Sequence, residues 1–138
     1  MKAIKSNSTM AAIEKAVAVD RVGAVLAIGF ADSGVYNQFW YYETANAAQA
    51  AFAKISEADN MFLINDHTAI NLNRADLITA RQNDYTGKGE VAFIFSGGIS
   101  RYIECADKAA AVELFNKIMK TQDTLNADDL KGGAENVD

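Results

Sequence analysis

Along the chain, apolar and polar residues first follow a strand-like pattern of short apolar runs and alternating positions, and then the spacing of a helix. This change from strand pattern to helix pattern occurs twice. Two segments place apolar side chains at i, i+3, i+4 and i+7, the spacing of a helix with one buried face. Thr44 and Asp107 precede these segments, and their side-chain oxygens suit the N-cap position. The pattern predicts helices over about residues 45–58 and 108–120.

The two helical segments also resemble each other in sequence, which predicts an internal duplication. Phe52-Ala53-Lys54-Ile55 returns as Phe115-Asn116-Lys117-Ile118, 63 positions later. An earlier pair of matching segments has an offset of 59, so the second copy would contain four extra residues. We predict that the copies are residues 1–59 and 60–120.

Before each helix, short apolar runs and alternating positions are typical of β-strands. Turns that contain glycine, such as Ser96-Gly97-Gly98, favour antiparallel neighbours, because parallel neighbours need long crossovers. The expected fold class is α+β: an antiparallel meander of four or five strands followed by one helix that covers it, twice over. The expected extended segments are residues 2–5, 9–13, 16–20, 24–31, 36–42, 61–65, 69–72, 76–82, 91–95 and 100–105.

The charge divides the chain into a nearly neutral body and an acidic end. Net charge is −5, and residues 121–138 account for −4 of it, with five acidic residues and one basic residue. This end has few apolar residues and no sustained periodicity, which is typical of a flexible segment. We therefore expect one domain over residues 1–120 and an acidic tail over 121–138. Such a tail can compete for a basic groove, recruit partner proteins by its charge, or only solubilise the chain.

The residue types argue against several chemistries. The chain has one cysteine, Cys105, and one histidine, His67, too few for a structural zinc site or an internal disulfide. No glycine-rich phosphate-binding motif or nucleophile-elbow motif occurs. No apolar stretch is long enough to span a bilayer, and the N-terminal residues do not fit a signal peptide. We expect a cytoplasmic protein without catalytic activity, metal or cofactor.

The aromatic run over residues 36–42 is the most unusual segment. In a strand, Trp40 faces the side opposite to Phe39 and Tyr41. Trp40 corresponds to an apolar residue of the second copy, so it should face the core, while Phe39 and Tyr41 point outward with Tyr102 in the equivalent strand. Outward aromatics on a sheet can stack unpaired bases, at ~1–3 kcal/mol per base. They equally suit an interface with another subunit.

These features lead to one hypothesis and two alternatives. The hypothesis is a non-catalytic protein that binds single-stranded DNA or RNA, with arginines on the phosphates. The candidate binding residues are three aromatics and three arginines: Phe39, Tyr41, Tyr102, Arg74, Arg81 and Arg101. The first alternative is a structural or interaction module that forms a homo-oligomer without nucleic acid. The second, a small-molecule or enzymatic domain with a pocket between the two copies, has no residue pattern in its favour.

The order of expected elements carries a family resemblance. Two tandem units of antiparallel strands followed by a helix, over residues 1–120, resemble the Whirly and Pur-alpha-type single-stranded nucleic-acid-binding proteins. The chain departs from them in its nearly neutral body and in lacking the basic stretch typical of Whirly proteins. The resemblance implies a sheet face that holds single strands and a tendency to form homo-oligomers.

Overall fold

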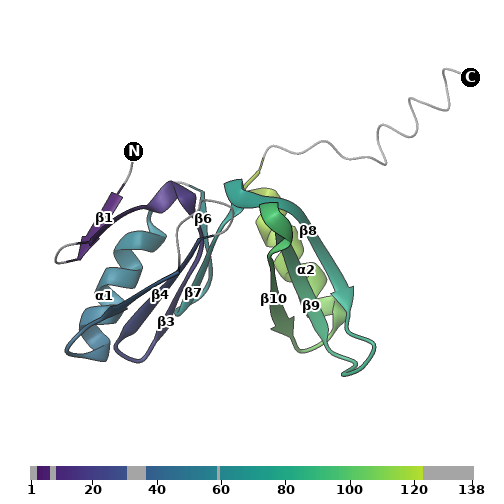
Figure 1. Cartoon of the computed structure of the whole chain (residues 1–138). Coiled ribbons are helices and arrows are strands. Elements are labelled where there is room, and N and C mark those ends of the chain that lie inside the picture. The colour runs from purple at the N-terminus through teal and green to yellow at the C-terminus, as the bar shows by residue number, and fades with distance from the viewer. Residues whose placement is uncertain (1–2, 7–8, 31–36, 59, 123–138) are drawn as a thin grey trace, which may run out of the picture. The chain divides into compact units, whose positions relative to one another are not determined.

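The computed structural model describes residues 3–6, 9–30, 37–58 and 60–122, which form an α+β fold with antiparallel sheets, as expected (Figure 1). No helix among these residues is long and apolar enough to cross a membrane. The expected flexible tail falls mainly on residues that lie outside this description. In chain order the elements are β1 (Ala3–Ser6), β2 (Thr9–Ala12), η1 (Ile13–Lys15), β3 (Ala16–Val22), β4 (Val25–Phe30), β5 (Gln38–Tyr41), α1 (Ala45–Ser56), β6 (Met61–Asn65), β7 (Thr68–Asn71), η2 (Leu72–Arg74), β8 (Ala75–Gln82), β9 (Gly89–Phe95), η3 (Ser96–Gly98), β10 (Ser100–Cys105) and α2 (Lys108–Lys120), where η marks a 3-10 helix.

The chain forms two compact units. The first unit comprises Met1–Ile78 and Ala92–Tyr102, and the second comprises Thr79–Val91 and Ile103–Asp138. The boundaries cut through β8, β9 and β10, which form a three-stranded sheet in the order β10-β9-β8. The first unit therefore contains one end of this sheet as well as everything up to Ile78.

Strand pairing in the first unit corrects the expectation that each copy forms its own meander. The main sheet has the order β5-β4-β3-β7-β6, so the hairpin β6-β7 joins strands that come much earlier in the chain. All four residues of β7 are buried, which favours a neighbouring strand on both sides. β3 supplies one neighbour, with Ala18 opposite Ile70 and Asp20 opposite Thr68. β1 and β2 pair only with each other among the described strands.

The internal duplication stays a prediction, although the order of elements has a regularity that bears on it. A 3-10 helix follows the second strand of each predicted copy. The two, η1 and η2, are 59 positions apart, the same offset that relates the matching segments in the sequence. Neither was expected from the periodicity, because three residues are too few to establish a period.

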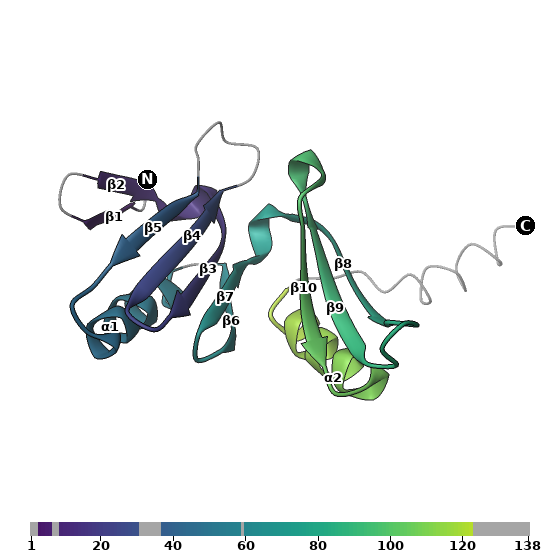
Figure 2. The ribbon, with the colours of Figure 1, turned by 60° about the horizontal axis from the view of Figure 1, so that its bottom comes forward.

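Helix α1 covers one face of the main sheet, where it contacts β3, β4 and β6 (Figure 2). Its N-cap is Thr44, as predicted: the hydroxyl accepts the backbone N–H of Ala47 at 3.1 Å. The buried face of α1 includes Phe52, which packs with Leu26 and Trp40 in the core. The opposite face of the sheet is not covered by this helix, and the candidate site lies there.

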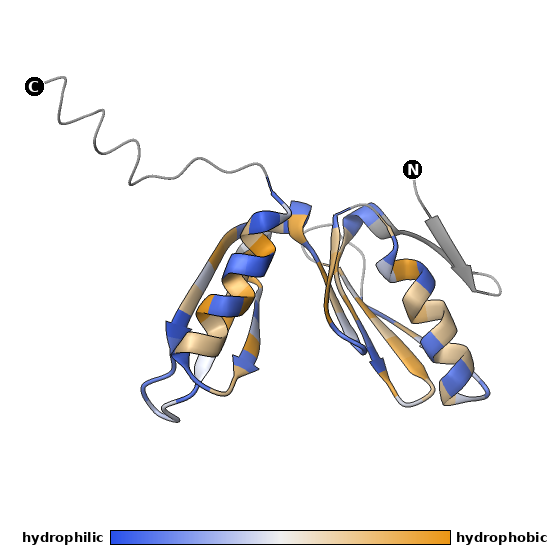
Figure 3. Cartoon of the chain, turned by 180° about the vertical axis from the view of Figure 1, so that it is seen from behind, coloured by the Kyte–Doolittle hydropathy of each residue, from blue (hydrophilic) through white to orange (hydrophobic). Residues whose placement is uncertain are grey.

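Helix α2 begins at the second predicted N-cap, Asp107, which has a carboxylate where Thr44 has a hydroxyl. The carboxylate of Asp107 accepts the backbone N–H of Ala110 at 2.8 Å. Strand β9 approaches this point so closely that a Cβ on Gly89 would overlap the carbonyl of Asp107. Figure 3 shows α1 mostly in the pale orange of alanine, while α2 alternates between hydrophilic and hydrophobic residues. Both helices are thus fixed at their first turn by a side chain that the sequence identifies.

Candidate functional site

The outward face of β5 carries the exposed aromatic side chains. Phe39 is 58% exposed and Tyr41 is 78% exposed, whereas Trp40 between them is 6% exposed and packs in the core. The alternation of a strand produces this arrangement, since successive side chains point to opposite faces. The predictions that Trp40 faces the core and that Phe39 and Tyr41 face outward are confirmed.

Small residues lie beside Phe39 on the same face of the sheet. Ala27 of β4 is directly opposite Phe39 of β5 on one side and Asp20 of β3 on the other. The next outward row holds Ala18 opposite Gly29. Three neighbouring outward positions therefore bear a methyl group or a hydrogen, and the surface is hollowed between larger neighbours.

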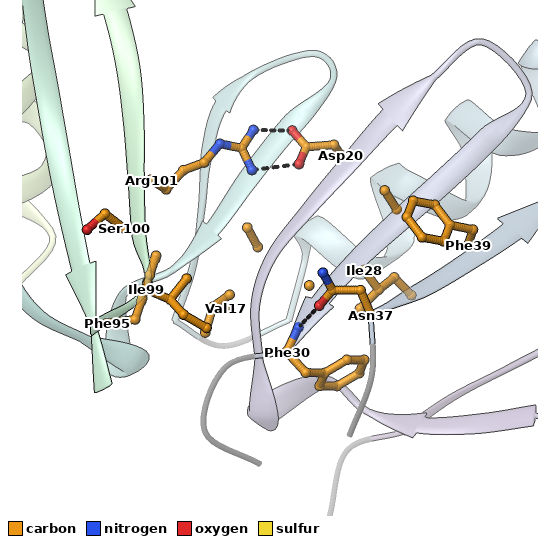
Figure 4. A pocket seen from close by; sticks show the side chains of 13 residues that line it. Val17, Asp20, Ile28, Phe30, Asn37, Phe39, Phe95, Ile99, Ser100 and Arg101 are labelled. Atoms are coloured by element: carbon orange, nitrogen blue, oxygen red, sulfur yellow. Dashed lines mark hydrogen bonds and ion pairs between the residues drawn. The ribbon is translucent and has the colours of Figure 1, made fainter. Parts of the chain in front are cut away.

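This hollow is the floor of a pocket of about 220 Å³ (Figure 4). All of the residues that line it belong to the first unit. Other walls come from Phe39 on β5, from Phe95 at the end of β9 and from Ile99 in the turn before β10. In that turn, the backbone N–H of Phe95 donates to the carbonyl of Ile99 at 2.8 Å. The pocket is mainly apolar, with a few polar groups in its walls.

An ion pair forms the main polar part of the wall. Arg101 donates from both terminal nitrogens to the carboxylate of Asp20, at 2.6 and 2.7 Å (Figure 4). The hydroxyl of Thr68 donates to the same carboxylate at 2.8 Å, and its oxygen lies 3.1 Å from Nδ1 of His67. Because the hydroxyl hydrogen is used for Asp20, Nδ1 of His67 is the donor to Thr68. Hydrogen bonding to Asp20 raises the pKa of Arg101, which remains fully charged.

Asn37 supplies a second polar group at the pocket. Its Oδ1 atom accepts the backbone N–H of Phe30 at 2.9 Å, at the end of β4. This bond fixes the side-chain amide. Its nitrogen has no hydrogen-bond partner among the described residues, so it can donate to a molecule in the pocket. Neither Asn37 nor Asp20 was among the predicted site residues. The signal for Asp20 was available, because it is the one charged residue within the run Ala16-Val17-Ala18-Val19-Asp20.

The remaining predicted site residues lie in different surroundings. Tyr102 on β10 is 49% exposed in the first unit, and Arg74 at the end of η2 is partly buried. Arg81 belongs to the second unit, where its Nε atom donates to Glu90 at 2.6 Å. Arg81 and Arg101 are both paired with carboxylates, so a phosphate would have to compete with an acidic side chain for either of them.

The reactive side chains of the described residues do not gather into a metal site. Within the described ranges, no three His, Cys, Asp or Glu side chains are grouped closely enough to hold a metal ion. Burial raises the pKa of Cys105, and the carboxylates of Asp107 and Glu104 raise it further. A raised pKa disfavours the thiolate, which is the nucleophilic form of cysteine. His67 lies exposed in the turn between β6 and β7.

Comparison with known proteins gives a fold neighbour and no family. No protein-family model matches the sequence. No curated protein matches it either. Among solved structures, the LytTr DNA-binding domain of a protein from Bacillus cereus, described as a methyl-accepting/DNA response regulator, is similar with a TM-score of 0.50. The two are 11% identical, and the match covers 86% of this chain and 94% of that domain. At this identity the likeness concerns the fold alone.

Proposed function

We propose that this chain binds nucleic acid without catalysing a reaction, and that an unpaired strand lies on the outward face of β5, β4 and β3. The observation that carries the proposal is the exposure of Phe39 and Tyr41 on a strand whose inward Trp40 is locked in the core. Their rings are held by a rigid element and remain open to solvent, as stacking on bases requires. The fold is also that of a domain whose name describes it as DNA-binding.

Arginine side chains would supply the electrostatic part of the binding. Arg101 is in the same unit as Phe39, and its guanidinium could exchange the Asp20 carboxylate for a phosphate. Arg74 and Tyr102 would add contacts within that unit, while Arg81 is a separate candidate for a phosphate contact of the second unit by itself. Because the body of the chain is nearly neutral, stacking would contribute a larger share of the affinity than charge.

Fluorescence anisotropy with a labelled single-stranded oligonucleotide tests the proposal. The double variant Phe39→Ala/Tyr41→Ala should bind at least about tenfold more weakly, because it loses two stacking rings. Tyr85→Ala is the matched control, since Tyr85 is fully exposed in a turn of the second unit. A duplex of the same sequence should bind more weakly than the single strand. The proposal is wrong if the folded double variant binds the oligonucleotide with unchanged affinity, or if the unmodified chain does not bind it.

A second candidate function, assembly of identical chains, rests on the position of β5. This strand is at one end of the sheet order, so one of its edges has no partner strand within the described sheet. An edge strand with exposed aromatics can pair with a second copy of the chain. Light scattering distinguishes the two functions. A stable oligomer that the double variant dissociates, together with no oligonucleotide binding, would favour assembly.

A further inference from the structure

Besides the exposed rings, the outward face carries the pocket beside Phe39, which has room for a ligand of its own. We infer that this pocket receives a single nucleobase, edge-on to the sheet and against the ring of Phe39. If the base is part of a bound single-stranded nucleic acid, this inference rests on the proposed function. A free nucleoside has the same chemistry and is a separate source of the same ligand.

The size of the pocket suits one planar ring system. A closed cavity of about 150 Å³ in a protein core can hold benzene. The present pocket, at about 220 Å³, has room for a ring with substituents but is below the usual range for larger ligands. Its floor is low because Ala18, Ala27 and Gly29 are small, so a ring can approach the sheet backbone closely.

The walls offer both of the interactions that bases use. Phe39, with most of its ring exposed, and Ile99, at 45% exposure, provide apolar surfaces at the rim. The amide nitrogen of Asn37 can donate to a ring nitrogen or carbonyl oxygen. Asp20 and Arg101 present an acceptor and a donor side by side in the opposite part of the lining. Asp20 and Arg101 already bond each other. An aliphatic ligand would leave the Asn37 amide nitrogen without an acceptor, whereas the edge of a base carries one.

Filling the pocket tests this inference without removing either exposed ring. Ala27→Leu places a larger side chain on the floor, directly between Phe39 and Asp20. Ala53→Leu is the matched control, because it makes the same change at an exposed position of α1 in the same unit. If Ala27→Leu does not fold, Gly29→Ala replaces it, because a Cβ there makes only ordinary contacts, the nearest at 3.6 Å to Val17.

Two readouts separate the sources of the base. Anisotropy with the labelled single strand measures the strand-bound form, and amide chemical shifts of Ala27, Gly29 and Arg101 during titration with deoxynucleosides measure the free form. Strand affinity about tenfold lower in Ala27→Leu, but unchanged in Ala53→Leu, supports a base held by the strand. Saturable nucleoside shifts support a free compound in the pocket, whether or not the strand affinity changes.

The outcomes also distinguish this inference from the proposed function. If the unmodified chain binds the strand, an unchanged affinity in Ala27→Leu together with no nucleoside shifts overturns the pocket and leaves stacking on Phe39 and Tyr41 in place. If the strand does not bind but nucleosides shift the pocket amides, the pocket stands and the proposed function is wrong. If the unmodified chain responds to neither probe, both are wrong.

Discussion

The two helices carry the same Phe-x-Lys-Ile sequence, yet they bury it to different depths. Phe52 in α1 is 1% exposed, whereas Phe115 in α2 is only partly buried. The smaller residues of the two stripes behave alike: Ala48, Ala111, Ile55 and Ile118 are all buried. The helical period thus selects which face of a helix is buried, while the surrounding strands decide how deeply its largest side chain is enclosed. In the first unit that enclosure includes Leu26 and Trp40.

The largest expected effect comes from truncating the two phenylalanines separately. Phe52→Ala should lower the free energy of unfolding of its unit by ~3–5 kcal/mol, since it leaves a cavity in an enclosed core. Phe115→Ala should cost about half as much, because part of its surface already faces solvent. Urea unfolding followed by circular dichroism measures both variants, and the fluorescence of Trp40, the chain's one tryptophan, gives a separate signal for the first unit. Equal losses of unfolding free energy in the two variants would mean that the sequence of the helix, and not the surrounding strands, decides how much its phenylalanine stabilises the unit.

Two strand glycines give the next comparison, one from each unit. Gly89→Ala should destabilise the second unit by ~1–3 kcal/mol, because the added methyl group overlaps the Asp107 carbonyl at the start of α2. Gly29→Ala should change stability by less than about 1 kcal/mol, since its Cβ would make only ordinary contacts. Thermal unfolding followed by circular dichroism measures both variants. A harmless Gly89→Ala would show that the start of α2 can move away from β9.

Local features of the fold were predictable because they depend on residues close in sequence. The caps at Thr44 and Asp107 and the bounds of α2 follow from spacing within one or two turns. The inward position of Trp40 follows from alternation along one strand and from its match to Ile103 in the predicted second copy. The joining of β6 and β7 to β3 was not predictable in this way. It depends on which strand pairs with the free edge of β7 in the β6-β7 hairpin. Periodicity along the sequence contains no information on the partner of a strand.

The candidate site shows the same limit more sharply. The outward positions of Phe39 and Tyr41 could be predicted from strand alternation together with the match of Trp40 to an apolar residue of the predicted second copy. The pocket requires the register of β3, β4 and β5, which aligns Asp20, Ala27 and Phe39 in one row. The partner of Arg101 is 81 positions away, so the sequence identified the charge but not the carboxylate that it contacts.

The smallest expected effect concerns Cys105, which is at the position equivalent to Tyr42 in the predicted duplication. Burial raises the pKa of both side chains, and for Cys105 two carboxylates add to the effect. A raised pKa lowers the thiolate fraction at any pH below it, so iodoacetamide should alkylate Cys105 more slowly in the folded chain than in the unfolded chain near neutral pH. The difference should shrink as pH rises through the folded pKa. Glu104→Gln should quicken the reaction only modestly, because burial is the larger cause. Equal alkylation rates for the folded and unfolded chains at neutral pH would show that Cys105 is open to water in the second unit. Tyr42 and Cys105 would then differ in burial, as Phe52 and Phe115 do.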